Sequence, residues 1–173
     1  ANLTWTVTDS GGTANSGANS LTQNLSIAIA AVNDAPTVTA PTSFTVTEDV
    51  ASNLVYTGTP FADVDSTNLT VTLSISEGTI TGNAGTGITV GGTATARTFT
   101  GTVTNLNTYF TTSGKITYTT ASNNNTSRTL TTTVSDSVAS DVTTTSTINI
   151  TAVNDAPTLT SFASVVGTTL EDT

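Results

Sequence analysis

The sequence predicts an all-β fold, a sandwich of antiparallel sheets, and three observations lead to this prediction. Apolar residues alternate with Thr or Ser in many short runs, as in Leu69–Ile75. This period of two is typical of strands with one buried and one solvent-exposed face. Gly-containing breaks separate the runs, and the abundant residues Thr and Val favour strands. Many short strands with turn signals between them favour a sandwich over a parallel α/β fold.

The segments expected to form strands share this alternation. In chain order they are Leu3–Thr8, Leu25–Ile29, Phe44–Val46, Leu69–Ile75, Ile88–Val90, Thr98–Phe99, Ile116–Tyr118, Leu130–Val134 and Ile148–Ile150. One segment departs from the pattern, because Val103–Phe110 places its apolar residues three and four positions apart. This spacing predicts a short helical turn that crosses one end of the sandwich.

A repeated heptapeptide divides the chain. Ala31–Thr37 returns unchanged as Ala152–Thr158. The interval leaves room for one complete unit of about 120 residues, a normal size for a β-sandwich domain. We therefore expect residues 1–31 to be the C-terminal strands of a preceding repeat, 32–152 to be one complete repeat, and 153–173 to begin a following repeat. On this interpretation the chain is a section of a longer tandem array.

Composition excludes several classes of protein. The chain of 173 residues carries 12 acidic and 3 basic residues, a net charge of −9, and no His or Cys. The few scattered bases predict no nucleic-acid surface, and no apolar stretch is long enough to span a bilayer. Without His, a Cys nucleophile or a phosphate-binding glycine loop, we expect no enzyme. Paired carboxylates could hydrolyse glycosides, but no aromatic-lined groove is predicted beside them.

The acidic residues are concentrated at a few recurring positions rather than along the strands. Asp63-Val64-Asp65 places two carboxylates two positions apart at the end of a predicted strand, and Asn33-Asp34 adds two more oxygen donors at the junction. Hard oxygen donors in this number suit Ca²⁺, which takes about six to eight of them, whereas zinc prefers His and Cys. Each motif alone also has a structural explanation, because Asp-x-Asp commonly caps a turn and Asp136 could cap a hairpin.

Taken in order, these motifs resemble the cadherin-like repeats of large bacterial surface proteins. The resemblance covers nearly the whole chain and is carried by Asn33–Pro36, Glu48, Asp63–Asp65, Asp136 and the stretch from Gly101 to Tyr118. It implies a Greek-key β-sandwich of the cadherin/immunoglobulin-like type in a tandem array. The Asp-Arg-Glu motif of animal cadherins is missing, so we expect fewer ions at each junction or weaker binding.

The resemblance also implies which residues bind Ca²⁺. The first junction would use Asn33, Asp34, Asp63, Asp65 and Asp136. The second would use Glu48 with Asn154 and Asp155, and its remaining ligands would lie beyond Thr173.

We expect a mechanical function that follows from this resemblance. The repeat would be an extender in the stalk of a secreted or cell-surface bacterial adhesin, with neighbouring repeats of the same polypeptide as partners and Ca²⁺ stiffening each junction. The alternative is a subunit that assembles with other copies of itself into an extracellular filament or sheath by pairing of strand edges. Carbohydrate or ice binding through Thr-rich faces ranks last, because the Thr residues lack regular spacing along the sequence.

Overall fold

A computed structural model describes residues 1–157, apart from the side chain of Asn15, and confirms an all-β protein. The chain separates into two compact units, Ala1–Asn33 and a second unit that begins at Asp34, and each is described by itself. Residues 158–173 lie outside the described part, so the predicted following repeat at 153–173 stays a prediction. The predicted tandem organisation of residues 1–31 and 32–152 is likewise not tested by this division.

The first unit is a β-hairpin. Strand β1 (Asn2–Thr8) pairs with the antiparallel strand β2 (Ser20–Ser26), and a loop containing the 3-10 turn η1 (Ala14–Ser16) connects them. Leu3 lies opposite Leu25, so the side chains of both strands share one apolar face. The strand predicted at 25–29 ends at Ser26 in the structure.

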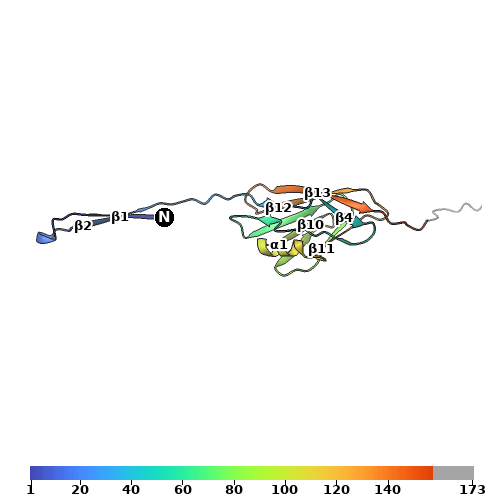
Figure 1. The fold of residues 1–173 in the computed structure, drawn as a ribbon, viewed down its shortest axis with the longest axis horizontal. Helices are drawn as coiled ribbons and strands as arrows, with labels where there is room; N and C mark the ends of the chain where they lie inside the picture. Colours follow the sequence, from blue (N-terminus) through green and yellow to red (C-terminus); the bar gives the residue numbers. More distant parts are fainter. Residues whose placement is uncertain (158–173) are drawn as a thin grey trace, which may run out of the picture. The chain divides into compact units, whose positions relative to one another are not determined.

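The second unit contains sheets that enclose one core, a sandwich-like arrangement. In Figure 1, β12 and β13 lie on one side of this unit, and α1 and β11 lie on the other. The six-stranded sheet has the order β4 (Ser43–Thr47), β13 (Val142–Thr151), β12 (Arg128–Ser135), β7 (Asn68–Ser74), β10 (Ala96–Thr102) and β9 (Ile88–Gly92). The three-stranded sheet has the order β5 (Ser52–Asn53), β11 (Ile116–Thr119) and β8 (Thr79–Gly82), and β3 (Thr37–Val38) pairs with β6 (Phe61–Ala62).

The pairing of the edge strand β4 with its neighbour β13 sets where the chain enters and leaves this unit. β4 and β13 run parallel, with Ile148 opposite Phe44, while the other strand pairs are antiparallel. Strand β13 therefore ends beside the end of β4, and the chain leaves the unit there. We call this the exit end. At the opposite, entry end, β7 and β13 begin and β12 ends.

The segment predicted as a helical turn is the α-helix α1 (Val103–Thr111). Thr102 caps its start, because the Thr102 side chain accepts a hydrogen bond from the backbone N–H of Asn105 at 3.2 Å. Leu106, Tyr109 and Phe110 form the buried face, as their three- and four-residue spacing predicts. No helix within residues 1–157 is long and apolar enough to cross a membrane.

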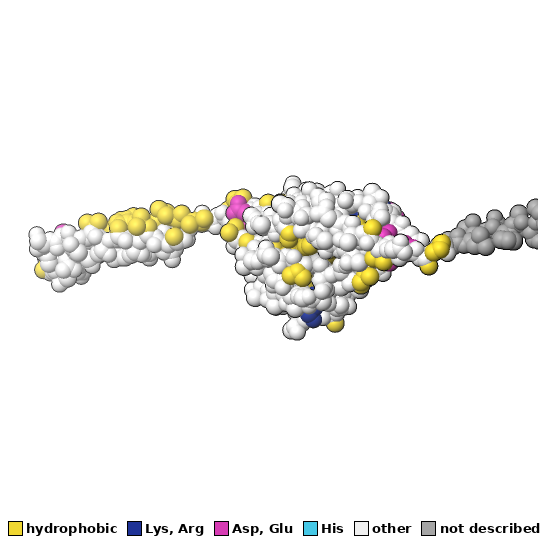
Figure 2. Space-filling model, turned by 45° about the vertical axis from the view of Figure 1, so that its right-hand side comes forward, with side chains coloured by type: hydrophobic (Ala, Val, Ile, Leu, Met, Phe, Trp, Pro, Cys, Tyr) yellow, Lys and Arg dark blue, Asp and Glu magenta, His cyan; other side chains and the backbone are white. Residues whose placement is uncertain are grey.

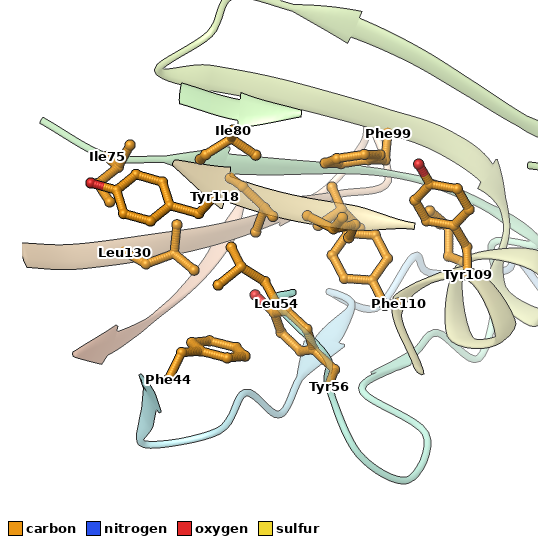
Figure 3. Packing of buried hydrophobic residues seen from close by; sticks show 14 of the residues in the cluster. Phe44, Leu54, Tyr56, Ile75, Ile80, Phe99, Tyr109, Phe110, Tyr118 and Leu130 are labelled. Atoms are coloured by element: carbon orange, nitrogen blue, oxygen red, sulfur yellow. The ribbon is translucent and has the colours of Figure 1, made fainter. Parts of the chain in front are cut away.

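Phe110 connects this helix to the centre of the core. Its ring meets those of Phe61, Tyr56 and Phe99 edge to face, with centroid distances of 4.8, 5.1 and 5.2 Å. Edge-to-face packing is the favoured geometry for aromatic pairs, and it adds about 0.5–1.5 kcal/mol beyond burial. Figure 3 shows the helix side chains Tyr109 and Phe110 packed among residues of both sheets. Phe110 thus joins α1 to the core that both sheets share.

Candidate metal centres at the two ends of the second unit

Acidic residues mark both ends of the second unit. Figure 2 shows the acidic side chains at its two ends, with most of the surface between them uncharged. Because β12 is antiparallel to β7, the residue after β12 and the residues before β7 meet at the entry end. Because β4 is parallel to β13, the residues that follow both strands meet at the exit end. The topology thus brings together acids that are far apart in the sequence.

At the entry end, Asp63 uses one oxygen to shape the turn before β7. Its Oδ1 accepts hydrogen bonds from the backbone N–H groups of Asp65 at 2.8 Å and Ser66 at 2.6 Å. Its other oxygen, Oδ2, is buried and has no hydrogen-bond partner among the described residues. A buried carboxylate oxygen without a donor is costly, so this atom calls for a ligand such as a cation or an ordered water.

Asp34 and Asp65 lie close to the turn that Asp63 caps. The Asp65 Oδ2 accepts a hydrogen bond from the backbone N–H of Asp34 at 2.7 Å, which ties the start of the unit to the turn. Asp34 and Asp63 also line one surface hollow, together with Ala35, Thr37, Ala62 and Val64. The sequence-predicted residues Asp34, Asp63 and Asp65 are therefore neighbours in the structure.

Asp136 follows β12 and is 9% exposed. Its Oδ1 accepts hydrogen bonds from the backbone N–H groups of Val138 and Ala139, both at 2.9 Å. This is the hairpin cap that the sequence offered as the structural explanation for Asp136. The predicted ligand Asn33 belongs to the first unit, so its place in an entry site stays a prediction.

At the exit end, Glu48 is buried at 2% exposure and holds the departing chain. Its backbone N–H donates to the carbonyl of Thr151 at 3.0 Å, which extends the pairing of β4 with β13. Its Oε2 then accepts a hydrogen bond from the backbone N–H of Val153 at 3.0 Å. The carboxylate thereby fixes the backbone just before Asn154 and Asp155.

Three carboxylates converge at this end. One oxygen each of Glu48, Asp49 and Asp155 lies within 4.8 Å of the others. Asp49 is held in place by a left-handed backbone with φ of 58°, a 2.8 Å hydrogen bond from its N–H to the Thr120 hydroxyl, and a 3.2 Å bond from the Asn123 N–H to its carboxylate. Asn154 lies next to this group and donates its side-chain amide to the Asp155 carbonyl at 3.4 Å.

No basic residue balances these three charges within residues 1–157. The ion pair of the described chain joins Arg128 to Glu77 at 2.6 Å, and it does not include Glu48, Asp49 or Asp155. Like charges held this close repel each other unless a cation or proton lies between them. The group of oxygens is a donor set that could hold a metal ion, and carboxylates favour hard cations such as Ca²⁺ or Mg²⁺.

The structure places Glu48 and Asp155, both members of the predicted ligand set, close to Asp49, which that set omitted. The signal was present, because Glu48-Asp49 recurs as Glu171-Asp172 with both acids retained. Metal binding by these residues stays a prediction. The chain matches no protein-family model, and no curated protein is significantly similar to it. Its function is therefore argued from the geometry.

Proposed function

We propose that this chain is a structural extender from the stalk of a large secreted or cell-surface protein, built of tandem cadherin-like β-sandwich repeats and stiffened by Ca²⁺ at their junctions. The observation that carries the proposal is the buried, partnerless Oδ2 of Asp63 at the entry end, with a cluster of three carboxylates at the exit end. A single acidic group has many explanations, but two oxygen-rich groups at the two points where the chain enters and leaves favour ions at junctions.

The strand topology suits such a stalk. Parallel pairing of β4 with β13 makes the chain enter and leave the second unit at opposite ends. Repeats of this kind can follow one another in line, with the load passing along the two paired strands. The same parallel pairing of a first and a last strand fits the Greek-key sandwich that the cadherin resemblance implies.

Ca²⁺ would act on the linkers through the acids at each end. Asp155 belongs to the linker that leaves the exit end, and Asp34 lies where the chain enters. Without a cation the carboxylates repel each other. A bound ion neutralises the charges and ties the linker to the sandwich, while Pro36, which is buried, limits rotation on the entry side.

Thermal unfolding of the whole chain, residues 1–173, in calcium and in EDTA tests the proposal. A ligand that binds only the folded state stabilises it by about 2.7 kcal/mol at 100 times its dissociation constant, so calcium should raise the melting temperature. Asp63→Asn and Asp65→Asn should reduce this gain. Asp141→Asn, which removes one exposed charge outside both groups, should leave it unchanged. Equal melting temperatures of the wild type in calcium and EDTA would contradict the proposal.

Small-angle scattering tests the mechanical part separately. The maximum dimension of the chain should be larger in calcium than in EDTA, because stiffened linkers keep successive units apart. If calcium stabilises the wild type but leaves its scattering profile unchanged, the metal sites remain supported. The proposal that calcium stiffens the linkers is then contradicted.

A further inference from the structure

The first unit has one polar, hydrogen-bonded face and one face with exposed apolar side chains. On the polar face, Thr4 donates to the Asn24 side chain at 2.6 Å, and the hydroxyls of Thr6 and Thr22 are 2.9 Å apart. The other face carries Gln23, opposite Trp5, and a set of exposed apolar side chains that form the yellow band along the hairpin in Figure 2. We call it the hairpin face, and it consists of Leu3, Trp5, Val7, Leu21, Leu25 and Ile27, each between 46% and 60% exposed. A two-stranded hairpin with such a face is marginally stable in water.

This hairpin has the same register as β12 and β13. The pair Leu3–Leu25 corresponds to Leu130–Ser146, and the pair Val7–Leu21 corresponds to Val134–Val142. The loops that follow also match, because the Asp9 carboxylate accepts the Gly11 N–H at 2.7 Å as the Asp136 carboxylate accepts the Val138 N–H at 2.9 Å. Strands β1 and β2 are therefore the structural equivalents of β12 and β13.

In the second unit the equivalent face is buried by an opposing layer. Leu130, Thr132, Val134 and Ile148 are 0% exposed and Ser146 is 2% exposed. Figure 3 shows Leu130 facing Tyr118 of β11 and Leu54 and Tyr56, which follow β5. The strands of this opposing layer, β5, β8 and β11, all precede β12 in the chain.

One position prevents the second unit of another copy from providing this cover. Trp5 takes the place of Thr132, whose hydroxyl lies 2.6 Å from that of Tyr56 in the buried core. An indole at this position would collide with the Tyr56 ring, and overpacking of a core is destabilising. The hairpin face therefore needs a layer with a smaller side chain where the second unit has Tyr56.

We propose that the hairpin face is half of a core, and that its other half is a β layer preceding residue 1 in the same polypeptide. This layer resembles the one formed by β5, β11 and β8, but it has a small side chain in place of Tyr56. Trp5 and Tyr56 are then specificity-determining residues. They keep the final hairpin of one repeat from docking into its neighbour, an error to which tandem homologous domains are prone. The inference rests on the proposed tandem-repeat function, but not on calcium.

The fluorescence of Trp5 tests the occupant, because the chain has a single Trp. In residues 1–173 we expect the emission and iodide quenching of a water-exposed indole at every protein concentration. A blue shift that grows with concentration would mean that a second copy covers the face, and would overturn the proposal. In the natural polypeptide, extended on the N-terminal side of Ala1, the emission should shift to the blue and quenching should fall. An exposed Trp5 in that longer protein, or a natural polypeptide without a preceding layer, would overturn it as well.

An exchange of residues tests the specificity. In the whole chain, Trp5→Thr/Thr132→Trp should lose the cooperative thermal transition that the Trp5→Thr control retains. Adding Tyr56→Ala should restore a cooperative transition and give a blue-shifted emission. A double variant as stable as the control, or a triple variant that regains no transition, would contradict the role of Tyr56. All of these measurements are made in EDTA, so they do not depend on whether calcium binds. A negative result would contradict the roles of Trp5 and Tyr56 but would not bear on the calcium sites.

Discussion

The two ends of the second unit hold their acidic residues in different ways. At the entry end the carboxylates cap turns of the sandwich itself, so Asp63 and Asp136 are fixed by hydrogen bonds from nearby backbone N–H groups. At the exit end the group includes Asp155, which lies on the linker after β13, and a hydrogen bond from the Val153 N–H to the buried Glu48 carboxylate anchors the described part of that linker. The entry site is thus arranged by the fold, whereas the exit site depends on where the linker lies.

This difference shows that turn capping and metal binding are compatible. Asp63 caps its turn with Oδ1 and leaves Oδ2 buried without a partner. A carboxylate has two oxygens, so one can shape the backbone while the other receives a cation. We therefore expect metal binding to change stability at the entry end and linker position at the exit end.

Among the changes that distinguish the two ends, Glu48→Ala should have the largest effect on stability. It leaves the Val153 N–H without its acceptor and empties a buried position, which should cost about 1–3 kcal/mol even in EDTA. Chemical denaturation in EDTA measures the cost. Glu48→Gln is the matched control, because it keeps an acceptor oxygen and removes the charge. It should stay close to the wild type in EDTA and lose only calcium binding at the exit end. Equal losses for both variants would show that the charge itself, not the hydrogen bond, holds the linker.

Alkaline pH should weaken the core that both ends share. Burial raises the pKa of Tyr56, Tyr109 and Tyr118 above the ordinary 10.0. Above pH 10 the unfolded chain releases phenolic protons that the folded chain keeps, so stability is unaffected below pH 10 and falls as the pH rises further. The slope for the buried Tyr56 is about 1.4 kcal/mol per pH unit. Urea unfolding between about pH 8 and 11.5 measures it.

Tyr56→Phe provides the control for this pH dependence. The variant should show a shallower loss above pH 10, because one shielded phenol is gone. Variants of the acidic ends such as Asp63→Asn should keep the wild-type slope. If Asp63→Asn changes the slope of stability against pH and Tyr56→Phe does not, the assignment of the alkaline loss to the core is contradicted.

Asp63→Asn should have opposite effects with and without calcium. The Asn side-chain oxygen can still accept from the Asp65 and Ser66 N–H groups, and the substitution removes a buried, partnerless charged oxygen. In EDTA the stability should therefore stay within about 1 kcal/mol of the wild type or rise. In calcium the variant should be the less stable protein, because its entry site is lost. Parallel denaturation curves in both buffers measure this reversal, and a large loss in EDTA would show that the charge serves the turn alone.

Asp49→Asn should have the smallest effect. Asn tolerates the left-handed backbone at this position and can accept the hydrogen bond from the Asn123 N–H, so stability in EDTA should change by only a few tenths of a kcal/mol. Calcium titration by calorimetry should nevertheless show weaker binding at the exit end. Unchanged calcium affinity would remove Asp49 from the site and leave Glu48 and Asp155 as the acidic ligands.

Much of this fold could be predicted from the periodicity of the sequence. The strands that periodicity did not predict were missed for physical reasons. Long alternating strands such as β7 and β12 and the apolar face of α1 carry a repeating pattern over several turns or pairs. Strands β3, β5 and β6 are two residues long, and two residues have no period to read. Their positions are set by pairing with distant segments, which a single sequence does not reveal.

The candidate sites were predicted only in part for a similar reason. Asp63 and Asp65 are two positions apart, so local spacing is enough to associate them. Asp49 joins Asp155 only because β4 and β13 are parallel and because a left-handed backbone turns its side chain toward the linker. That geometry depends on tertiary pairing, although the repeated Glu-Asp dipeptide gave an early indication of it.

A crystal structure of the whole chain grown in millimolar calcium tests the central claim most directly. Calcium binding predicts anomalous density beside Asp63 Oδ2 and between Glu48, Asp49 and Asp155, with oxygen distances of about 2.3–2.6 Å. Ordered water alone at both positions, with the carboxylates unmoved, would contradict the account of calcium-stiffened junctions.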